Sequence, residues 1–414
     1  MKPYIKNIHI NSLYHLQDLD IAIADENSPH ILLTGKNGSG KTVLLNAISD
    51  FLDHIKEDTN FHFLNYPRWL KSEKEQLSRM HEGSQEYIKM RATFKQTESF
   101  YNKIYGKVNL SFNDGYGFIN DYQEGNFIIA FYQAARKTKI DGPKNPTKPS
   151  IKIKGGNRDN LTSQLLNFLS DLKIQEALAR NEGQISDANQ IKAWFERFEQ
   201  ILKGFFDDNS LNLEFNYRDY TFKIHTNGKS FKFTELSDGF IAILDIVADL
   251  ILKMQNVGNL TSEFNKPGIV LIDEVETHLH LQLQKSILPM LTTLFPNIQF
   301  IVSTHSPFVL RSLPNATAYD LEHKEAISDL TNYSYQALTE GYFGVSTDSD
   351  YARTRLNELK VLLEKDNLSY TEKIDAKMLL EDFNKIPEAS LPEIVGAFRN
   401  LEIKHKLKIK ELQG

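Results

Sequence analysis

Residues 35–42 read GKNGSGKT and match the pattern G-x-x-x-x-G-K-[ST] in full. The stretch follows a short apolar run, residues 31–33, and precedes a segment, residues 40–54, whose apolar side chains cover one broad helical face. Glycines let the backbone turn so that successive N–H groups point at a phosphate, and a helix N-terminus adds partial positive charge. The pattern therefore predicts a strand, a phosphate-binding loop and a helix. The alternative is a glycine-rich turn without a ligand.

The residues of this loop have different expected roles toward ATP and Mg²⁺. Lys41 would reach the β- and γ-phosphates, and the Thr42 hydroxyl would bind Mg²⁺. The residues expected to hold the nucleotide are Gly35, Asn37, Gly38, Ser39, Gly40, Lys41 and Thr42.

A second motif, GIVLIDE at residues 268–274, ends an apolar run with two carboxylates. The run predicts a buried parallel strand, and ligands bind at the carboxyl ends of such strands. Asp273 would hold Mg²⁺, directly or through water, and Glu274 is the natural general base for the attacking water. A strand that ends in solvated acids is common, so this motif gains its meaning from the phosphate loop.

A third motif, FIVSTHSP at residues 300–307, ends another apolar run in hydroxyls and a histidine. The spacing from Asp273 leaves room for one helix and one strand, so His305 can lie beside the γ-phosphate. There it could hydrogen-bond the γ-phosphate or orient the water. The alternative is a histidine with a purely structural role in the core or on the surface.

A fourth motif, ELSDGF at residues 235–240, opens a predicted helix. Ser237 and Gly239 are explained equally well as parts of a plain helix N-cap or of an anion site. In the second case they could close on a nucleotide that another subunit holds.

The composition is that of an ordinary globular protein. Lys and Arg total 48 and Asp and Glu total 54, which gives a formal charge of −6, and there is no cysteine. Disulfides, cysteine zinc sites and a cysteine nucleophile are thereby excluded, and a cytoplasmic location is expected. The start of the chain lacks a signal peptide, and no apolar stretch has the length of a membrane helix, so no membrane contact is expected.

Periodicity predicts alternating strands and helices around these motifs. Strands are expected within 4–34 and at 87–94, 107–112, 126–133, 211–225, 268–272 and 298–302. Helices are expected at 40–54, 159–181, 188–206, 239–254 and 279–294, and beyond 330 with breaks near Asn367 and Pro387. Residues 136–158 hold eight Lys or Arg against one Asp and predict a loop. This loop could contact the phosphates of a nucleic acid, or it is a solvated linker.

Together the four motifs, in this order, resemble the ATP-binding-cassette ATPase heads of the SMC-like and defence-associated kind. LSDG resembles their signature loop, VLIDE their Walker B strand and STHSP their switch-histidine segment, while residues 276–280 fill their E-x-H-L-H stretch. The resemblance implies an α/β fold, with a P-loop on a central mixed or parallel sheet. It also implies a composite site in which Ser237 and Gly239 act on the nucleotide of a second copy, and it suggests Gln133 as the glutamine that helps bind Mg²⁺ and water.

The resemblance implies three regions. Residues 1–60 with 211–330 would form the head, 61–210 an insert of strands, basic loop and helical lid, and 331–414 a helical C-terminal region. The LSDG sequence differs from the LSGGQ of transporters, so a transport ATPase is not expected. The interval between Lys41 and Ser237 is too short for the long coiled coil of an SMC protein.

Residues 331–350 with the helical tail resemble the PtuA ATPases of Septu antiphage systems, which are also found with some retrons. That resemblance implies a homodimer or higher oligomer formed through the ATP sites, and a separate HNH nuclease partner like PtuB. Related ATPases carry a Toprim nuclease, and Asp348-Ser349-Asp350 has a D-x-D pattern. The tail is too short and too helical for Toprim, so no nuclease activity is expected in this chain.

Three functions remain open from the sequence. The first is an ATP-driven regulator of a separate effector nuclease. The second is a RecF-like or SMC-like ATPase that repairs or remodels DNA and binds it through residues 136–158. The third is a module that binds ATP with negligible turnover, which Glu274 opposes because such a module needs no general base.

Overall fold

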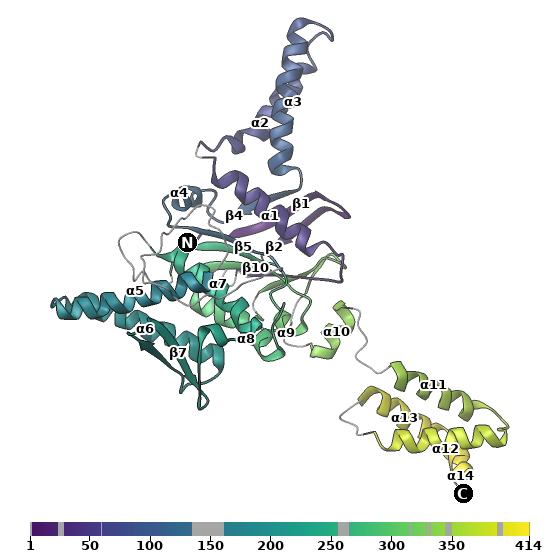
Figure 1. Ribbon diagram of the computed structural model, residues 1–414. Helices are drawn as coiled ribbons and strands as arrows, with labels where there is room; N and C mark the ends of the chain where they lie inside the picture. Colours follow the sequence, from purple (N-terminus) through teal and green to yellow (C-terminus); the bar gives the residue numbers. More distant parts are fainter. Residues whose placement is uncertain are drawn as a thin grey trace. The chain divides into compact units, whose positions relative to one another are not determined.

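The computed structural model describes residues 2–23, 29–58, 60–134, 161–255, 265–314, 316–327, 330, 333–343, 350–386 and 392–413. The predicted loop at 136–158, and Asp348 and Ser349 of the D-x-D pattern, lie outside these residues. The chain divides into two compact units, Met1–Tyr333 and Ser334–Gly414 (Figure 1).

A six-stranded sheet forms the centre of the first unit, with the order β12-β11-β3-β10-β9-β5. Its strands are β3 (Ile31–Thr34), β5 (Ile128–Tyr132), β9 (Gly268–Ile272), β10 (Ile298–Ser303), β11 (Thr317–Asp320) and β12 (Glu325–Ile327). All neighbours are parallel except β11 and β12. Every residue of β3, β9 and β10 is buried, which explains why their sequences are largely apolar, with Thr34, Gln299 and Ser303 as the polar exceptions.

An antiparallel sheet with the order β2-β1-β4 lies against the same core. It consists of β1 (Ile5–Leu13), β2 (Leu16–Ala22) and β4 (Val108–Phe112). Helix α1 (Lys41–Lys56) buries one face that includes Leu44, Leu45, Ile48 and Phe51, and this face belongs to the same cluster. The sheets and α1 therefore place the phosphate loop at the edge of one continuous core.

A helical hairpin, α2 (Tyr66–Leu77) and α3 (Gln85–Tyr105), projects from the first unit (Figure 1). The strand predicted at 87–94 is wrong, because these residues belong to α3. Their apolar residues alternate locally, but the less exposed positions continue at helical spacing through Met90, Phe94, Thr97 and Tyr101. The side chain of Ser84 also caps the helix by accepting a hydrogen bond from the N–H of Tyr87.

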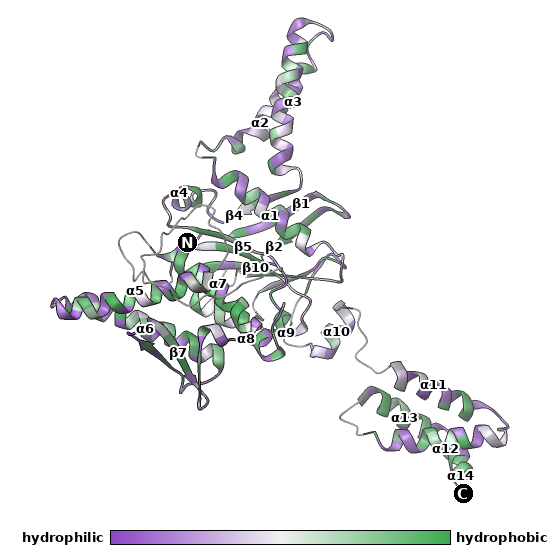
Figure 2. Cartoon of the chain, in the orientation of Figure 1, coloured by the Kyte–Doolittle hydropathy of each residue, from purple (hydrophilic) through white to green (hydrophobic). Residues whose placement is uncertain are grey.

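The rest of the first unit largely follows the prediction. Helices α5 (Leu161–Asn181), α6 (Ile185–Phe206), α7 (Asp238–Met254) and α8 (Leu281–Leu294) confirm the expected helices. Helix α7 is hydrophobic along most of its length (Figure 2) and largely buried. The strand region at 211–225 forms a three-stranded sheet, β6 (Asn212–Asn216), β7 (Thr221–Thr226) and β8 (Lys229–Lys232). The short helices are η1 (His62–Asn65), α4 (Phe118–Gln123), η2 (Phe233–Glu235) and α9 (Pro307–Leu310).

The second unit is helical, as expected. It contains α10 (Tyr335–Phe343), α11 (Asp350–Glu364), α12 (Tyr370–Asn384), α13 (Pro392–Lys404) and α14 (Lys406–Gln413). The ends of α11 and α12 coincide with the predicted breaks near Asn367 and Pro387. A small apolar cluster that includes Leu359, Leu380 and Phe398 holds α11, α12, α13 and α14 together. Within the described ranges of both units, no helix has the length and hydrophobicity needed to cross a membrane.

Candidate functional site

The predicted phosphate loop connects the end of β3 to the start of α1. Its glycines Gly35, Gly38 and Gly40 have φ angles of 126°, 86° and 98°, a conformation that side chains disfavour. A Cβ atom on Gly35 would lie 2.8 Å from Ser39 Oγ and 3.0 Å from Asp320 Oδ1. Glycine is therefore required here by both conformation and space, and the loop can keep its tight curvature.

Lys41 is held inside the curve of this loop. Its ammonium donates hydrogen bonds to the carbonyl oxygens of Gly35, at 2.7 Å, and Lys36, at 3.1 Å, and its residue is only 5% exposed. Burial lowers the pKa of Lys41 to about 8, although the carboxylates of Glu276, Glu274, Asp273 and Asp320 act in the opposite direction. The cation thus lies at the centre of a group of acids.

Asp273 joins the two predicted motifs. The Thr42 hydroxyl donates to Asp273 Oδ1 at 3.1 Å, and the Ser303 hydroxyl donates to the same oxygen at 2.6 Å. Asp273 is 3% exposed, while Thr42 is exposed. A hydroxyl and a carboxylate at this separation are both ligands that Mg²⁺ prefers, so the pair fits the expected metal.

Glu274 begins the loop that follows β9. Its φ angle is 45°, in the left-handed region, and its N–H donates to Ser303 Oγ at 2.8 Å. The Thr277 hydroxyl lies 3.4 Å from Glu274 Oε2. The backbone of Glu274 is therefore fixed by β10, while its carboxylate is only lightly bound.

His305 lies in the segment between β10 and α9. Its N–H donates to Glu276 Oε1, and the Thr304 hydroxyl donates to Glu276 Oε2 at 2.8 Å. Burial lowers the pKa of His305, and the nearby Lys41 ammonium lowers it further. Burial raises the pKa of Glu276. The N–H of Thr304 donates to the carbonyl oxygen of Leu33 at 2.9 Å, so the structure brings the first and third motifs together.

Gln133 follows β5 at the same edge of the sheet. The strand pairs in parallel with β9, and the N–H of Asp273 donates to the carbonyl oxygen of Tyr132 at 2.8 Å. Gln133 is exposed, one residue beyond this contact. The backbone positions of Gln133 and Asp273 are therefore adjacent.

Ser237 and Gly239 lie at the start of α7. Ser237 is the N-cap, but its exposed side chain makes no capping hydrogen bond. Gly239 is buried, and a Cβ atom there would lie 2.5 Å from the carbonyl oxygen of His278. Across the described residues, no hydrogen bond connects Ser237 to the phosphate loop of its own chain. Gly239 instead contacts the loop that follows Glu274.

Three residues of the site received no individual role from the sequence: Ser303, Glu276 and Asp320. Asp320 ends β11, is fully buried, and approaches Gly35 while accepting a hydrogen bond from His323 Nδ1 at 2.6 Å. The signal for Asp320 was weak, because residues 316–319 read ATAY, a short and only partly apolar stretch before the acid. Ser303 and Glu276 lie within motifs that the sequence singled out, but only the structure shows which groups they bind.

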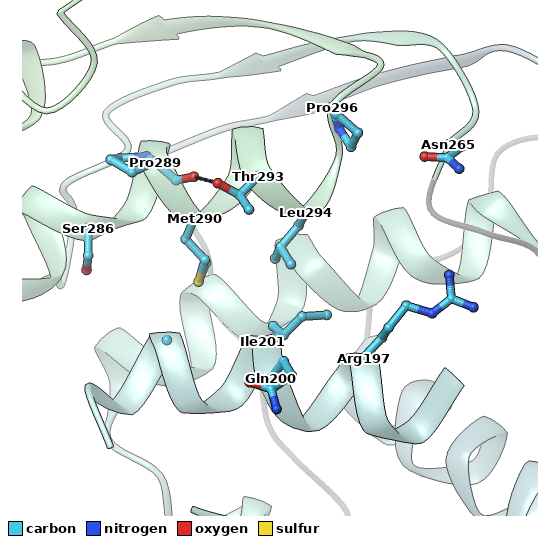
Figure 3. A pocket seen from close by; sticks show the side chains of 11 residues that line it. Arg197, Gln200, Ile201, Asn265, Ser286, Pro289, Met290, Thr293, Leu294 and Pro296 are labelled. Carbon is cyan, nitrogen blue, oxygen red and sulfur yellow. Dashed lines mark hydrogen bonds between the residues drawn. The ribbon is translucent and has the colours of Figure 1, made fainter. Parts of the chain in front are cut away.

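A hollow of about 560 Å³ lies between α6 and α8, apart from this site. Figure 3 shows Met290 and Leu294 of α8 facing Ile201 of α6. None of its lining residues belongs to the four motifs, so the hollow is not the predicted nucleotide site.

Comparison with known proteins identifies the family. Residues 31–311 match the family model described as "AAA domain, putative AbiEii toxin, Type IV TA system". The chain is 24% identical over 400 residues to the Septu protein PtuA of Bacillus mycoides, which covers 92% of this chain and 50% of that protein. It is 28% identical to the retron Vc95 probable ATPase of Vibrio cholerae, over 71% of this chain and 53% of that protein. The chain thus spans about half the length of these relatives.

Among solved structures, the SMC head domain from Thermotoga maritima is similar, with 14% identity and a TM-score of 0.33 over 77% of this chain and 94% of that one. The family model covers all four motifs and more than half of the chain. The chain therefore belongs to this AAA domain family.

Proposed function

We propose that this chain binds ATP with Mg²⁺ and hydrolyses it in the cytoplasm, and that nucleotide-dependent self-association lets it regulate a separate effector nuclease. The observation that carries the ATPase part is the pair of hydrogen bonds by which Thr42 and Ser303 meet on Asp273. These two bonds bring together the phosphate loop, the acid that follows β9 and the switch segment.

The residues divide the work of hydrolysis between them. Lys41 would exchange its carbonyl partners for the phosphates, which neutralises their charge. Thr42 and Asp273 would hold Mg²⁺, which supplies charge stabilisation at the phosphate oxygens. Glu274 would accept the proton of the attacking water, and His305 would orient that water or the γ-phosphate. Gln133 would assist from the end of β5.

The exposed N-terminus of α7 supports the proposed self-association. Ser237 has an exposed hydroxyl without a capping partner, and it stands at a helix N-terminus, which favours anions. A second copy could bring these groups to the exposed side of the phosphate loop, where Lys36, Asn37 and Gly38 are accessible. The site would then be completed only in a dimer or higher oligomer.

The partner nuclease is proposed from the relatives. One relative is a Septu protein PtuA and another a retron ATPase, and we expect no nuclease activity in this chain itself. An HNH nuclease of the PtuB kind is the expected effector. We also propose that the chain divides into an ATPase head, an inserted region at 61–210 and a helical region from 331.

A second candidate, nucleic-acid binding, is favoured by the charges of the α2–α3 hairpin. Its lysines and arginines are Arg68, Lys71, Lys74, Arg79, Lys89, Arg91, Lys95 and Lys103, and all are exposed. Among the described residues none of them forms an ion pair, whereas Lys173, Lys203 and Lys253 on α5, α6 and α7 do. Unpaired cations on a projecting hairpin suit a phosphate backbone.

This candidate is tested by binding of a fluorescent single-stranded oligonucleotide at several salt concentrations. Replacing Lys89, Lys95 and Lys103 with Glu should weaken binding and reduce its salt dependence. Replacing Lys360, Lys373 and Lys377 of the second unit with Glu changes the net charge equally and serves as the control. Equal binding by both variants would exclude the hairpin.

The ATPase proposal is tested by measuring phosphate release from Mg·ATP by the wild-type chain and by the Glu274→Gln variant. The proposal expects turnover in the wild type and its near loss in the variant, with nucleotide binding retained. Turnover that is unchanged in the variant would contradict the assignment of the base.

A further inference from the structure

Glu276 has no role in the mechanism above, yet both of its carboxylate oxygens are used. Oε1 accepts the backbone N–H of His305, and Oε2 accepts the hydroxyl of Thr304. Hydrogen bonds to a charged acceptor are stronger and shorter than neutral ones, so a carboxylate is well suited to fix a backbone. Glu276 therefore binds two successive residues of the switch segment.

The switch segment has other bonds, but none of them holds the N–H of His305. The N–H of Thr304 donates to the carbonyl oxygen of Leu33 at 2.9 Å, and the N–H of Ser306 donates to the Thr304 hydroxyl at 3.0 Å. The Ser306 hydroxyl donates to Gln284 Oε1 at 2.6 Å. The N–H of His305 itself donates to Glu276, at the position where the imidazole leaves the chain.

The loop that carries Glu276 is itself constrained. Glu274 and His278, on either side of it, both have left-handed φ angles, 45° and 68°, which residues other than glycine seldom adopt. The N–H of Leu279 donates to the carbonyl oxygen of Glu276 at 2.8 Å, and Gly239 packs against the carbonyl oxygen of His278. Such strained backbone persists only where the surroundings enforce it, and it concentrates at functional sites.

We propose that Glu276 is a positioning residue for ATP hydrolysis, whose carboxylate fixes the backbone of His305 and thereby directs its imidazole. This inference rests on the proposed function, because His305 must act on the nucleotide for its orientation to matter. It separates two acids that stand close together in sequence: Glu274 receives the proton, and Glu276 orients the histidine. The carboxylate of Glu276 also acts on the Lys41 ammonium, whose pKa it raises, so this acid lies within electrostatic reach of the phosphate loop.

The kinetic test uses the full chain and the variants Glu276→Ala, Glu276→Gln, His305→Ala and Glu276→Ala/His305→Ala. The Glu276→Ala change should lower kcat about 100-fold and leave KM for ATP within about 3-fold, since misplacing a reacting group costs roughly this much. Gln keeps one acceptor oxygen and should lose less. Because Glu276 acts through His305, the double variant should be no more than about 2-fold slower than His305→Ala.

The matched control is Glu176→Gln on α5. Glu176 also uses both oxygens, toward Lys173 and Arg180, but it belongs to none of the four motifs. This variant should keep the wild-type kcat. If Glu276→Ala does not fold, the Gln variant alone carries the comparison.

A second readout is deuterium exchange at the amide of residue 305, which does not depend on turnover. That amide should be protected in the wild type and in His305→Ala, and should exchange at least about 10-fold faster in Glu276→Ala. Two results would overturn the proposal. One is a double variant in which the kcat losses of the two single variants multiply, and the other is an equal rate of amide exchange at residue 305 in all variants. A slow His305→Ala beside a normal Glu276→Ala would overturn the role of Glu276 alone, whereas a normal kcat in His305→Ala would overturn the role of His305 and the inference with it.

Discussion

The Thr42 hydroxyl donates a hydrogen bond of 3.1 Å to Asp273 Oδ1, between residues that lie 231 positions apart in the chain. Thr42 is in the first turn of α1 and Asp273 directly follows β9, so the bond links the end of the phosphate loop to the end of β9. The Ser303 hydroxyl binds the same oxygen from β10. Three segments that the sequence singled out separately therefore meet at one carboxylate.

Lys41→Ala should abolish nucleotide binding, because the cation held against the loop carbonyls is the one proposed to meet the phosphates. A fluorescent ATP analogue measures this directly. The control is Lys203→Ala, which removes a partly buried ion pair with Glu199 on α6, away from the site, and should bind as the wild type does. Unchanged affinity in Lys41→Ala would refute the phosphate-loop role.

Glu274→Gln should retain bound ATP and favour the associated state. The loss of the base stops hydrolysis, while Ser237 of one copy can still meet the nucleotide bound by another. Light scattering with ATP and Mg²⁺ should report a larger species for this variant than for the wild type with ADP. A variant that stays the same size under both conditions would argue against a composite site.

Ser303→Ala should lower both stability and turnover. The hydroxyl donates to Asp273 and accepts the N–H of Glu274. Its removal therefore takes away one hydrogen bond to Asp273 and the side-chain acceptor of the Glu274 N–H. A loss of about 1–3 kcal/mol in unfolding free energy is expected, together with a lower kcat. The control is Ser170→Ala on α5, a buried serine outside the site, where denaturation should detect a loss but kcat should hold. Normal turnover in Ser303→Ala would separate this residue from the chemistry.

Gly239→Ala should displace the start of α7 or the loop after Glu274, because its Cβ atom would meet the carbonyl oxygen of His278 at 2.5 Å. Overpacking of this kind costs about 1–3 kcal/mol, and kcat should fall as well. Gly396→Ala in α13 meets nothing within 4 Å and should be neutral or slightly stabilising in the same denaturation assay. Equal behaviour of the two variants would show that the contact is unimportant.

The sequence predicted the central elements because their signals are local and strong. Short, largely apolar runs predicted β3, β9 and β10, and the glycine pattern predicted the loop before Lys41. The error at 87–94 arose because a short alternating run satisfies the strand pattern, whereas the helical period of α3 becomes visible only through Tyr101. Local patterns fail where the deciding contacts lie further along the chain.

The site was predictable in composition but not in connection. The motifs named Asp273, Glu274 and His305, yet they could not show that Ser303 links the first two or that Glu276 holds the third. Those links form because β10 lies beside β9 in the sheet. The order of strands in a sheet cannot be predicted from the sequence of any single segment. The same holds for Asp320, which reaches the phosphate loop only because β11 lies beside β3.

The central claim is that Thr42 and Asp273 share one metal at the phosphate loop. Isothermal titration with a non-hydrolysable ATP analogue, with and without Mg²⁺, tests it most directly in the wild type, Thr42→Ala and Asp273→Asn. The account predicts that Mg²⁺ strengthens binding to the wild type by about 10-fold or more, and that either substitution removes most of this gain. An equal gain from Mg²⁺ in all three proteins would contradict it.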